Sequence, residues 1–241
     1  MSTKSIGAIW TVGHSSRGEQ EFMELLALYR IQAVADVRRF PGSRRQPQFA
    51  REALARSLAQ HGVGYLWIPK LGGRRKARPE SRNTAWRNES FRGYADHLST
   101  AEFAEGFQEL LALASRRRTA LMCAEALWWR CHRAVISDVL ACSGIKVTHI
   151  LDATHSSEHP YTSAARILDG KLDYASEAGT PSPPEYRQAD HIEDLIDEAG
   201  AESFPASDPP AITPRRKRKT VAPKPENPAP GPDGGDHRSR G

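Results

Sequence analysis

Two kinds of hydrophobic pattern alternate along the first 151 residues. Short apolar runs, typical of buried strands, are separated by longer stretches in which apolar residues recur every three or four positions, as on one face of a helix. The apolar runs cover residues 8–13, 33–37, 63–68, 119–122 and 146–151. The periodic stretches predict helices within residues 22–29, 49–62, 91–115 and 131–140, the third of which is long enough for two helices.

This alternation of strands and helices predicts an α/β fold. About five βα units in this order are typical of a single parallel-sheet domain with helices on both faces of the sheet. Each crossover between neighbouring parallel strands is expected to be right-handed.

The composition changes near Ala175. Twelve of the 17 prolines lie beyond Glu177, whereas all five tryptophans lie before it. We therefore expect a core domain over residues 1–175 and a largely disordered, Pro-rich and charged tail over residues 176–241. A basic run at residues 215–219 is either a nucleic-acid contact or part of a solvated linker.

Charge is distributed unevenly along the chain. Residues 38–92 hold 14 Lys and Arg against three acids, a net charge of +11, although the whole chain carries only +5. A field of this size favours encounters with an anionic partner, such as a nucleotide or a nucleic acid. The alternative is a solvated basic surface that the acidic residues 152–207 partly neutralise.

The chain shows no apolar segment long enough to span a bilayer, and residues 1–7 lack the apolar stretch of a signal peptide. We therefore expect a cytoplasmic protein with no membrane partner. The three cysteines, Cys123, Cys131 and Cys142, are then expected to be free thiols or ligands rather than parts of a disulfide framework. The sequence leaves the oligomeric state open.

Polar residues follow every predicted strand. Since ligands of open parallel sheets bind outside the carboxyl ends of the strands, these residues are the candidates for a site at one edge. In chain order they are His14 and Ser15, then Asp36, Arg38 and Ser43, then Gly72 and Gly73, then Cys123 and Glu125, and finally Asp152 and His155.

The richest of these segments places Cys123-Ala124-Glu125 and Cys131-His132-Arg133 around a predicted strand-to-helix turn. Cations in the first turn of a helix are disfavoured by the macrodipole, by about 0.3–1 kcal/mol each, unless an anion is bound there. Because helix N-termini bind phosphates and carboxylates, the segment favours an anion pocket. The alternative is that the helix starts earlier and that Arg133 pairs with Glu125.

The first functional hypothesis is an enzyme that acts on a phosphate-bearing substrate. Cys123 or Cys131 is the candidate nucleophile, with Cys123 favoured because Cys131 shares an apolar helix stripe, and His14 or His132 is the candidate general base. Asp36 or Glu125 would orient a partner. The candidate substrate-binding residues are Ser15, Arg38, Ser43, Gly72, Gly73, His132 and Arg133.

Two alternatives remain open. The first is a non-catalytic nucleic-acid-binding module, in which Trp67, Trp86 and Tyr94 would stack on bases between basic residues. The second is a zinc protein in which Cys123, Cys131 and His132 are ligands together with His14 or Glu125. The spacing fits no usual C-x₂₋₄-C site, and adjacent Cys131 and His132 rarely both reach one tetrahedral ion, so we assign no metal ligand. No phosphate-binding or dinucleotide-binding glycine motif is present, and no cofactor is expected.

The same residues carry a resemblance to a known family. The chain resembles the domain-of-unknown-function family number 488 over roughly residues 6–174. The resemblance implies a small α/β domain and no established activity. It rests on Thr11-Val12-Gly13-His14-Ser15, Asp36-Val37-Arg38 with Pro41 and Ser43, Tyr65 before Leu71-Gly72-Gly73, Cys123-Ala124-Glu125, Cys131-His132-Arg133 and Val147-Thr148-His149-Ile150.

Overall fold

A computed structural model describes residues 6–42 and 44–176. Contacts divide the chain into two units, residues 1–208 and 209–241, and every described residue belongs to the first. The strands are β1 (Ala8–Gly13), β2 (Ala33–Asp36), β3 (Gly64–Trp67), β4 (Thr119–Cys123), β5 (Lys146–Ile150), β6 (Ser156–Glu158), β7 (Arg166–Leu168) and β8 (Lys171–Asp173). The α-helices are α1 (Glu19–Leu28), α2 (Arg51–Gln60), α3 (Glu89–His97), α4 (Ala101–Ala114) and α5 (Arg133–Cys142). Three short 3-10 helices are η1 (Pro47–Phe49), η2 (Pro69–Leu71) and η3 (Trp128–Arg130).

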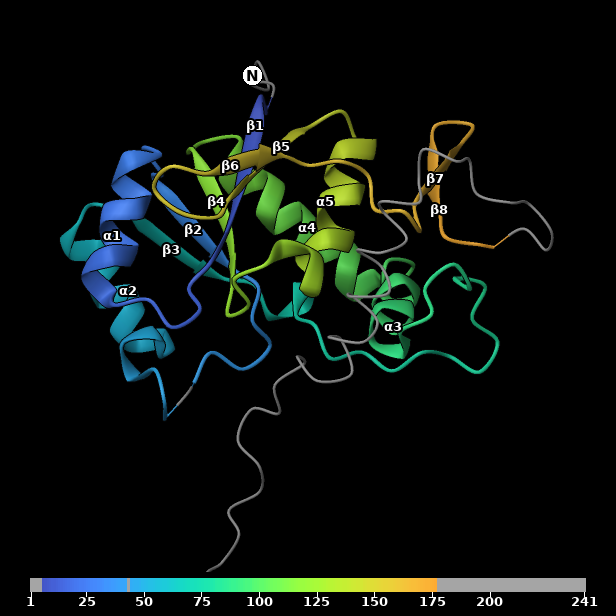
Figure 1. The fold of residues 1–241 in the computed structure, drawn as a ribbon, viewed down its shortest axis with the longest axis horizontal. Coiled ribbons are helices and arrows are strands. Elements are labelled where there is room, and N and C mark those ends of the chain that lie inside the picture. Colours follow the sequence, from blue (N-terminus) through green and yellow to red (C-terminus); the bar gives the residue numbers. More distant parts are fainter. Residues whose placement is uncertain (1–5, 43, 177–241) are drawn as a thin grey trace, which may run out of the picture. The chain divides into compact units, whose positions relative to one another are not determined.

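Six strands form one sheet in the order β3-β2-β4-β1-β5-β6. The first five are parallel to their neighbours, and β6 pairs antiparallel with β5 at the edge. The sheet therefore confirms the predicted α/β class, with helices on both faces (Figure 1).

Two hydrophobic clusters sandwich the sheet. Helices α1 and α2 pack on one face, where Phe22, Leu26 and Leu54 meet Val12 and Met122 of the strands. Helices α3, α4 and α5 pack on the other face, where the cluster includes Phe91, Leu110 and Ile136. Since successive strand residues point to opposite faces, β4 sends Met122 to the first cluster and Cys123 to the second.

The strand order reverses in the middle of the sheet. The chain leaves β1 through α1 on one face and leaves the neighbouring β4 through α5 on the other face, so the connections diverge between these two strands. In open parallel sheets this topological switch point is where a ligand crevice forms. The carboxyl ends of β1 and β4 carry Gly13 and Cys123, which are direct neighbours in the register.

The structure differs from the sequence prediction in two details. It adds the edge strand β6, and it adds the β7–β8 hairpin, which forms a separate two-stranded sheet. The predicted tail, including the basic run at residues 215–219, lies outside the described residues. Within the described part of the chain, no helix is both long and apolar enough to cross a membrane.

Candidate active site

The position of Cys123 follows from its place in β4. All five residues of this strand are buried, and Cys123 shares the face of Leu121, toward α5. Hydrogen bonds continue the β1–β4 pairing past the strand ends, because His14 N donates to Cys123 O at 3.0 Å and Ser15 N donates to Ala124 O at 2.8 Å. The first loop residues after both strands are therefore fixed.

Cys131 stands where α5 begins. Its backbone is extended, with φ −143° and ψ 151°, whereas His132 already has helical angles. The backbone N–H and the guanidinium group of Arg133 both act on the Cys131 sulfur and lower its pKa. Cys131 therefore lies immediately before His132, the N-cap of α5, at the end of the helix where exposed N–H groups and the helix dipole favour a negative charge.

His132 lies beside this sulfur in a defined tautomer. Its Nε2 is 3.1 Å from the carbonyl oxygen of Val37, which only accepts hydrogen bonds, so Nε2 carries the proton. The other ring nitrogen, Nδ1, lies 3.4 Å from Cys131 Sγ and is available as an acceptor. A cysteine, an imidazole and a third group that orients the imidazole form the arrangement of an activated nucleophile.

Arg133 is the largest fully buried side chain, with 0% exposure. Its Nη2 donates to the backbone carbonyls of Glu125 and Ala126, and its Nε has no acceptor among the described residues. No carboxylate in the described part of the chain forms an ion pair with it. A buried cation is costly unless an anion neutralises it, and the Cys131 sulfur is the group in contact that can supply the charge.

The pKa values of the two neighbouring thiols are shifted in opposite directions. Burial by itself would raise the pKa of Cys131, but the hydrogen bond from the Cys123 thiol and the charge and hydrogen bonds of Arg133 outweigh it and lower the pKa to about 6. The hydrogen bond to Cys131, together with burial, raises the pKa of Cys123 well above the usual thiol value. The sequence-based preference for Cys123 stays a prediction, and the surroundings of the two sulfurs favour Cys131, the other nucleophile that the sequence named.

A second polar cluster lies at the ends of β1 and β2. Asp36 is fully buried and accepts four hydrogen bonds, from Arg38 N, Nε and Nη2 and from the hydroxyl of Tyr65, at 2.6–3.0 Å. The remaining donor, Arg38 Nη1, lies 3.1 Å from His14 Nε2. This carboxylate is saturated, so its role is to orient Arg38 and, through it, His14.

His14 is held from three sides. Its Nδ1 donates to Ser15 O at 2.9 Å, and its ring stacks on Phe49 with centroids 4.1 Å apart. Burial lowers the pKa of His14 to about 4, and the charge of Arg38 acts in the same direction. The imidazole is therefore neutral at pH 7 and accepts from Arg38. The charge of Arg133 also reaches His14, which places the two clusters within electrostatic range.

The predicted glycines serve close packing. A Cβ on Gly73 would stand 2.8 Å from His132 Nδ1, and a Cβ on Gly72 would stand 2.8 Å from Pro69 O. The loop after η2 therefore packs against the imidazole that faces Cys131. Of the remaining predicted residues, Ser43 lies outside the described residues, and Glu125 accepts a 3.3 Å hydrogen bond from Leu127 N through its carboxylate. The predicted alternative of an Arg133–Glu125 pair is realised through the backbone carbonyl and not through the carboxylate.

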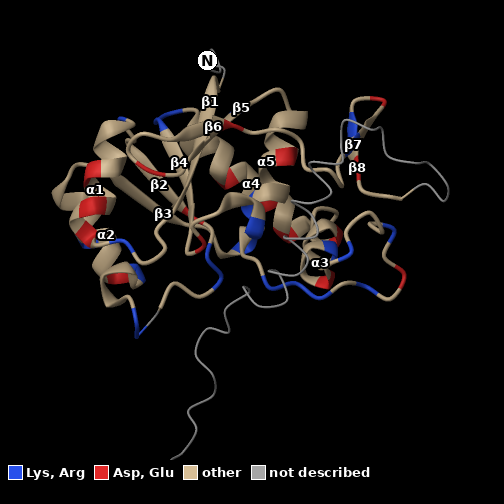
Figure 2. Ribbon diagram, in the orientation of Figure 1, with Lys and Arg blue, Asp and Glu red and all other residues tan. Residues whose placement is uncertain are grey.

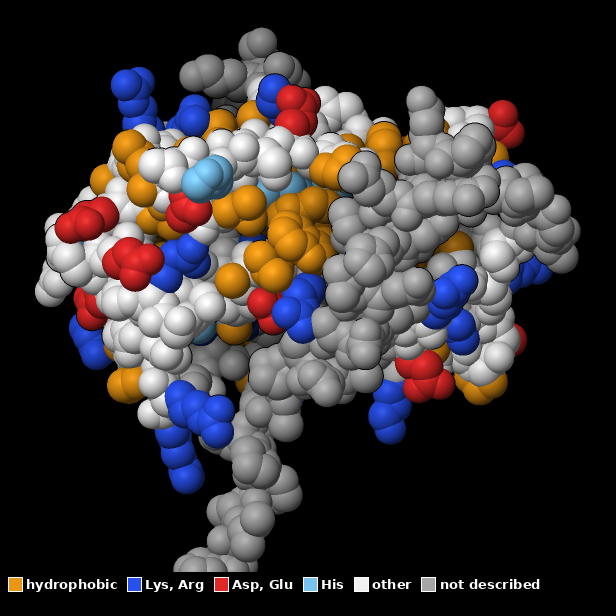
Figure 3. All heavy atoms as spheres, viewed as in Figure 1, with side chains coloured by type: hydrophobic (Ala, Val, Ile, Leu, Met, Phe, Trp, Pro, Cys, Tyr) orange, Lys and Arg blue, Asp and Glu red, His pale blue; other side chains and the backbone are white. Residues whose placement is uncertain are grey.

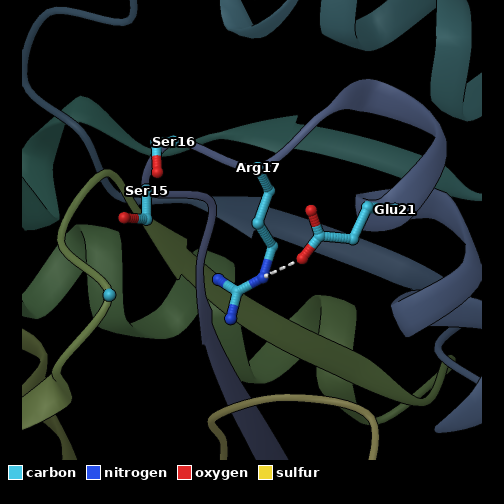
Figure 4. A pocket seen from close by; sticks show the side chains of 5 residues that line it. Ser15, Ser16, Arg17 and Glu21 are labelled. Carbon is cyan, nitrogen blue, oxygen red and sulfur yellow. Dashed lines mark ion pairs between the residues drawn. The ribbon is translucent and has the colours of Figure 1, made fainter.

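An open pocket lies at the divergence of β1 and β4, lined by Ser15, Ser16, Arg17, Glu21 and Ala126. Figure 4 shows the two serine hydroxyls on the same loop as Arg17, whose guanidinium pairs with Glu21 at 3.3 Å. Ala126 joins this pocket to the buried cluster, because its carbonyl accepts from Arg133. Ser16 and Arg17 were not predicted, although both follow His14 and Ser15 directly.

Three of these side chains could hold a metal ion. The ligand atoms of Cys123, Cys131 and His132 all lie within 4.8 Å of one another. Cys131 and His132 thus come closer together than the sequence argument allowed. The positive charge of Arg133 also acts on the Cys131 sulfur, however, and a metal ion bound there would be repelled by that charge.

The predicted aromatic stacking surface does not form. Trp86 is 3% and Tyr94 1% exposed, and Trp86 stacks on another core ring, that of Phe91, at 4.7 Å. Trp67 is half-buried and covered by the Arg51 guanidinium at 4.7 Å. Lys and Arg do recur along the loop between η2 and α3, but on the face in Figure 3 they are scattered rather than gathered in one patch (Figures 2 and 3).

The end of β5 contributes little to the site. Asp152 and His155 are exposed and bind each other at 2.9 Å. A buried hydrogen-bond chain around His149 of this strand was not predicted from the sequence. His149 is fully buried and lies 2.7 Å from Thr11 Oγ1 and 2.9 Å from a ring nitrogen of His159. The other ring nitrogen of His159 lies 2.9 Å from Asp138. His149 also stacks on Trp128 at 4.0 Å, which anchors η3 directly before Cys131.

The fold and the site together define a class: an α/β protein with a Cys-His-Arg cluster at the switch point of a parallel sheet. The family model described as Domain of unknown function DUF488 matches residues 19–140, half of the chain, and the protein belongs to this family. No curated protein and no solved structure matches the chain.

Proposed function

We propose that this protein is an enzyme in which the Cys131 thiolate attacks a phosphate-bearing substrate. The observation that carries the proposal is the position of the Cys131 sulfur, 3.4 Å from His132 Nδ1 and bonded to the backbone and guanidinium of Arg133. Thiolates, and not thiols, are the nucleophilic form of cysteine, and these contacts favour the thiolate.

His132 is suited to move the proton. Burial lowers the pKa of His132, so the imidazole beside the thiolate is neutral and can pass a proton from water to another group through Nδ1. In the proposed reaction the thiolate Sγ forms a bond to an electrophilic centre of the substrate, the bond from that centre to the leaving group breaks, and the leaving group takes a proton that Nδ1 relays from water. The hydrogen bond from Nε2 to Val37 O keeps the ring in place throughout.

A phosphate-bearing substrate fits the surroundings of this cluster. The charge of +11 over residues 38–92 attracts anions, and the serine hydroxyls of the neighbouring pocket can donate to phosphate oxygens. Arg133 Nε, which lacks an acceptor among the described residues, is a further donor. Nucleotides and nucleic acids are therefore the substrate classes to test.

The proposal is tested by mapping alkylation of the native protein at pH 7 with iodoacetamide, followed by peptide mass spectrometry. Cys131, which is only 3% exposed, should be modified by this small reagent and much more slowly by a bulky maleimide. A nucleotide or inorganic phosphate that occupies the site should slow its modification at least several-fold.

The Cys142→Ser variant is the control, because Cys142 is half-buried and bonds to Gly170 O, away from the cluster. It should leave the labelling of Cys131 unchanged, whereas Cys131→Ser should abolish it. Native protein in which Cys131 stays unmodified while Cys142 reacts, or which contains stoichiometric zinc, would contradict the proposal.

A further inference from the structure

Two thiols with opposite surroundings lie together in the core of the site. The sulfurs of Cys123 and Cys131 are within 4.8 Å, and the Cys123 thiol hydrogen-bonds to Cys131. Both are buried, at 9% and 3% exposure. In the mechanism proposed above Cys123 only donates a hydrogen bond to Cys131, and its own sulfur does not react.

The positions of the two cysteines suit a covalent bond between them. Cys123 ends β4 and Cys131 precedes α5, and the η3 loop connects the two residues. Trp128 of this loop stacks on His149, and Arg133 holds the loop through the carbonyls of Glu125 and Ala126, so the backbone between the two cysteines is held in place. A disulfide requires the sulfurs to approach to about 2.05 Å, and rotation of the two cysteine side chains is the movement that would bring them together.

We propose that Cys131 and Cys123 form a dithiol–disulfide pair, in which Cys131 reacts with a small peroxide and Cys123 resolves the product. This inference rests on the proposed function, since it uses the same Cys131 thiolate. It assigns to Cys123 a role that the nucleophile alone does not explain.

The reaction has two steps. The Cys131 thiolate attacks one oxygen of hydrogen peroxide, the O–O bond breaks, and the departing hydroxide takes a proton to become water, which leaves a sulfenic acid on Cys131. The Cys123 sulfur then attacks the Cys131 sulfur, the S–O bond breaks, and hydroxide leaves with the Cys123 proton as a second water. Two thiols are oxidised by two electrons in total, and one peroxide is reduced to two waters.

The surroundings favour this order of events. Arg133 and the N-terminus of α5 stabilise the attacking thiolate on Cys131, whereas Cys123 keeps its proton until the sulfenic acid forms. The burial of both sulfurs favours a small oxidant over a bulky disulfide. Oxidation would also remove the nucleophile, so a thiol reductant would restore the activity of the proposed enzyme.

The test is to treat the full-length Cys142→Ser protein with hydrogen peroxide and to analyse its peptides without reduction. We expect one peptide pair joined through Cys123 and Cys131, which disappears after dithiothreitol treatment. The matched variant Cys123→Ser should form no such pair and should instead trap dimedone at Cys131, because its sulfenic acid has no resolving thiol.

The outcomes separate this inference from the proposed function. If Cys131 is alkylated at pH 7 but peroxide yields no Cys123–Cys131 pair, the dithiol inference is overturned and the nucleophile stands. If Cys131 is inert to both reagents, the proposed function fails as well. Dimedone labelling of Cys131 that is equally strong in the presence and absence of Cys123 would also overturn the resolving role.

Discussion

Arg133 is the residue on which the properties of the site depend. It is fully buried, it holds the loop after β4 through the carbonyls of Glu125 and Ala126, and it contacts the Cys131 sulfur. A guanidinium group without a carboxylate partner among the described residues stabilises the charged form of the nearest acid, here a thiol. The same side chain therefore both positions the loop and prepares the nucleophile.

Replacing Arg133 separates these two roles. Arg133→Ala removes the positive charge and should raise the pKa of Cys131 by about one to three pH units, so that alkylation at pH 6.5 slows by a factor between about three and about two hundred. Arg133→Lys keeps a charge but lacks the planar fork, and it should retain part of the reactivity. The measurement is the rate of iodoacetamide modification at Cys131, with circular dichroism to confirm folding. Equal rates in Arg133→Ala and the parent protein would show that the arginine is structural only.

The sequence predicted several polar side chains at one edge of the sheet. His14, Asp36, Arg38 and Cys123 were expected there because they lie at strand ends, with Arg133 at the start of the next helix. Arg38 hydrogen-bonds to both Asp36 and His14, and Cys123 lies beside Gly13 in the register. The choice between the two thiols could not be predicted, because it depends on which sulfur receives the Arg133 backbone N–H. That contact is set by the backbone angles of a single residue.

The loop after β4 packs closely against the end of β1. A Cβ on Gly13 would stand 1.9 Å from the carbonyl oxygen of Glu125, a distance at which backbone must move. Gly13 is thus required for the close approach of this loop to the end of β1. The same carbonyl accepts from Arg133, so a shift of the loop is transmitted to the thiol.

Gly13→Ala should therefore destabilise the protein by about 1–3 kcal/mol, since extra atoms are forced into a packed contact. It should also lower the reactivity of Cys131 at neutral pH. Gly42→Ala is the control, because nothing lies within 4 Å of a Cβ at that position. Urea denaturation of both variants, combined with alkylation rates, tests the link, and a Gly13→Ala protein as stable and as reactive as Gly42→Ala would refute it.

The elements with strong hydrophobic patterns were predicted well, and the weak ones were missed. The bounds of the five parallel strands fall within one or two residues of the predicted apolar runs. Four of these strands contain buried positions, and β3 is half-buried throughout. Strand β6 consists of Ser156, Ser157 and Glu158, all exposed, and shows no apolar alternation. It pairs with the edge of β5 through its backbone and through the ion pair of Glu158 with Lys146, neither of which gives a hydrophobic pattern.

For the molecule as a whole, the order of the strands determines that the site exists. Local patterns predict that strands and helices alternate, but not that β4 inserts between β1 and β2, because such pairings are made between residues about 85–110 positions apart in the chain. This insertion creates the switch point and brings Gly13, Asp36 and Cys123 to one edge. The burial of Trp86 and Tyr94 likewise follows from packing that their sequence neighbours do not reveal.

Cys131 is expected to be a thiolate at neutral pH, and the pH dependence of its alkylation in the intact protein measures its protonation. Its pKa is lowered to about 6, so the thiolate forms as the pH rises through about 6 and is protonated again as the pH falls below it. Site-resolved mass spectrometry between pH 4 and pH 10 should give a rate at Cys131 that reaches half its plateau near pH 6. A half-plateau at about pH 8.5 or above, as for an ordinary thiol, would contradict the account.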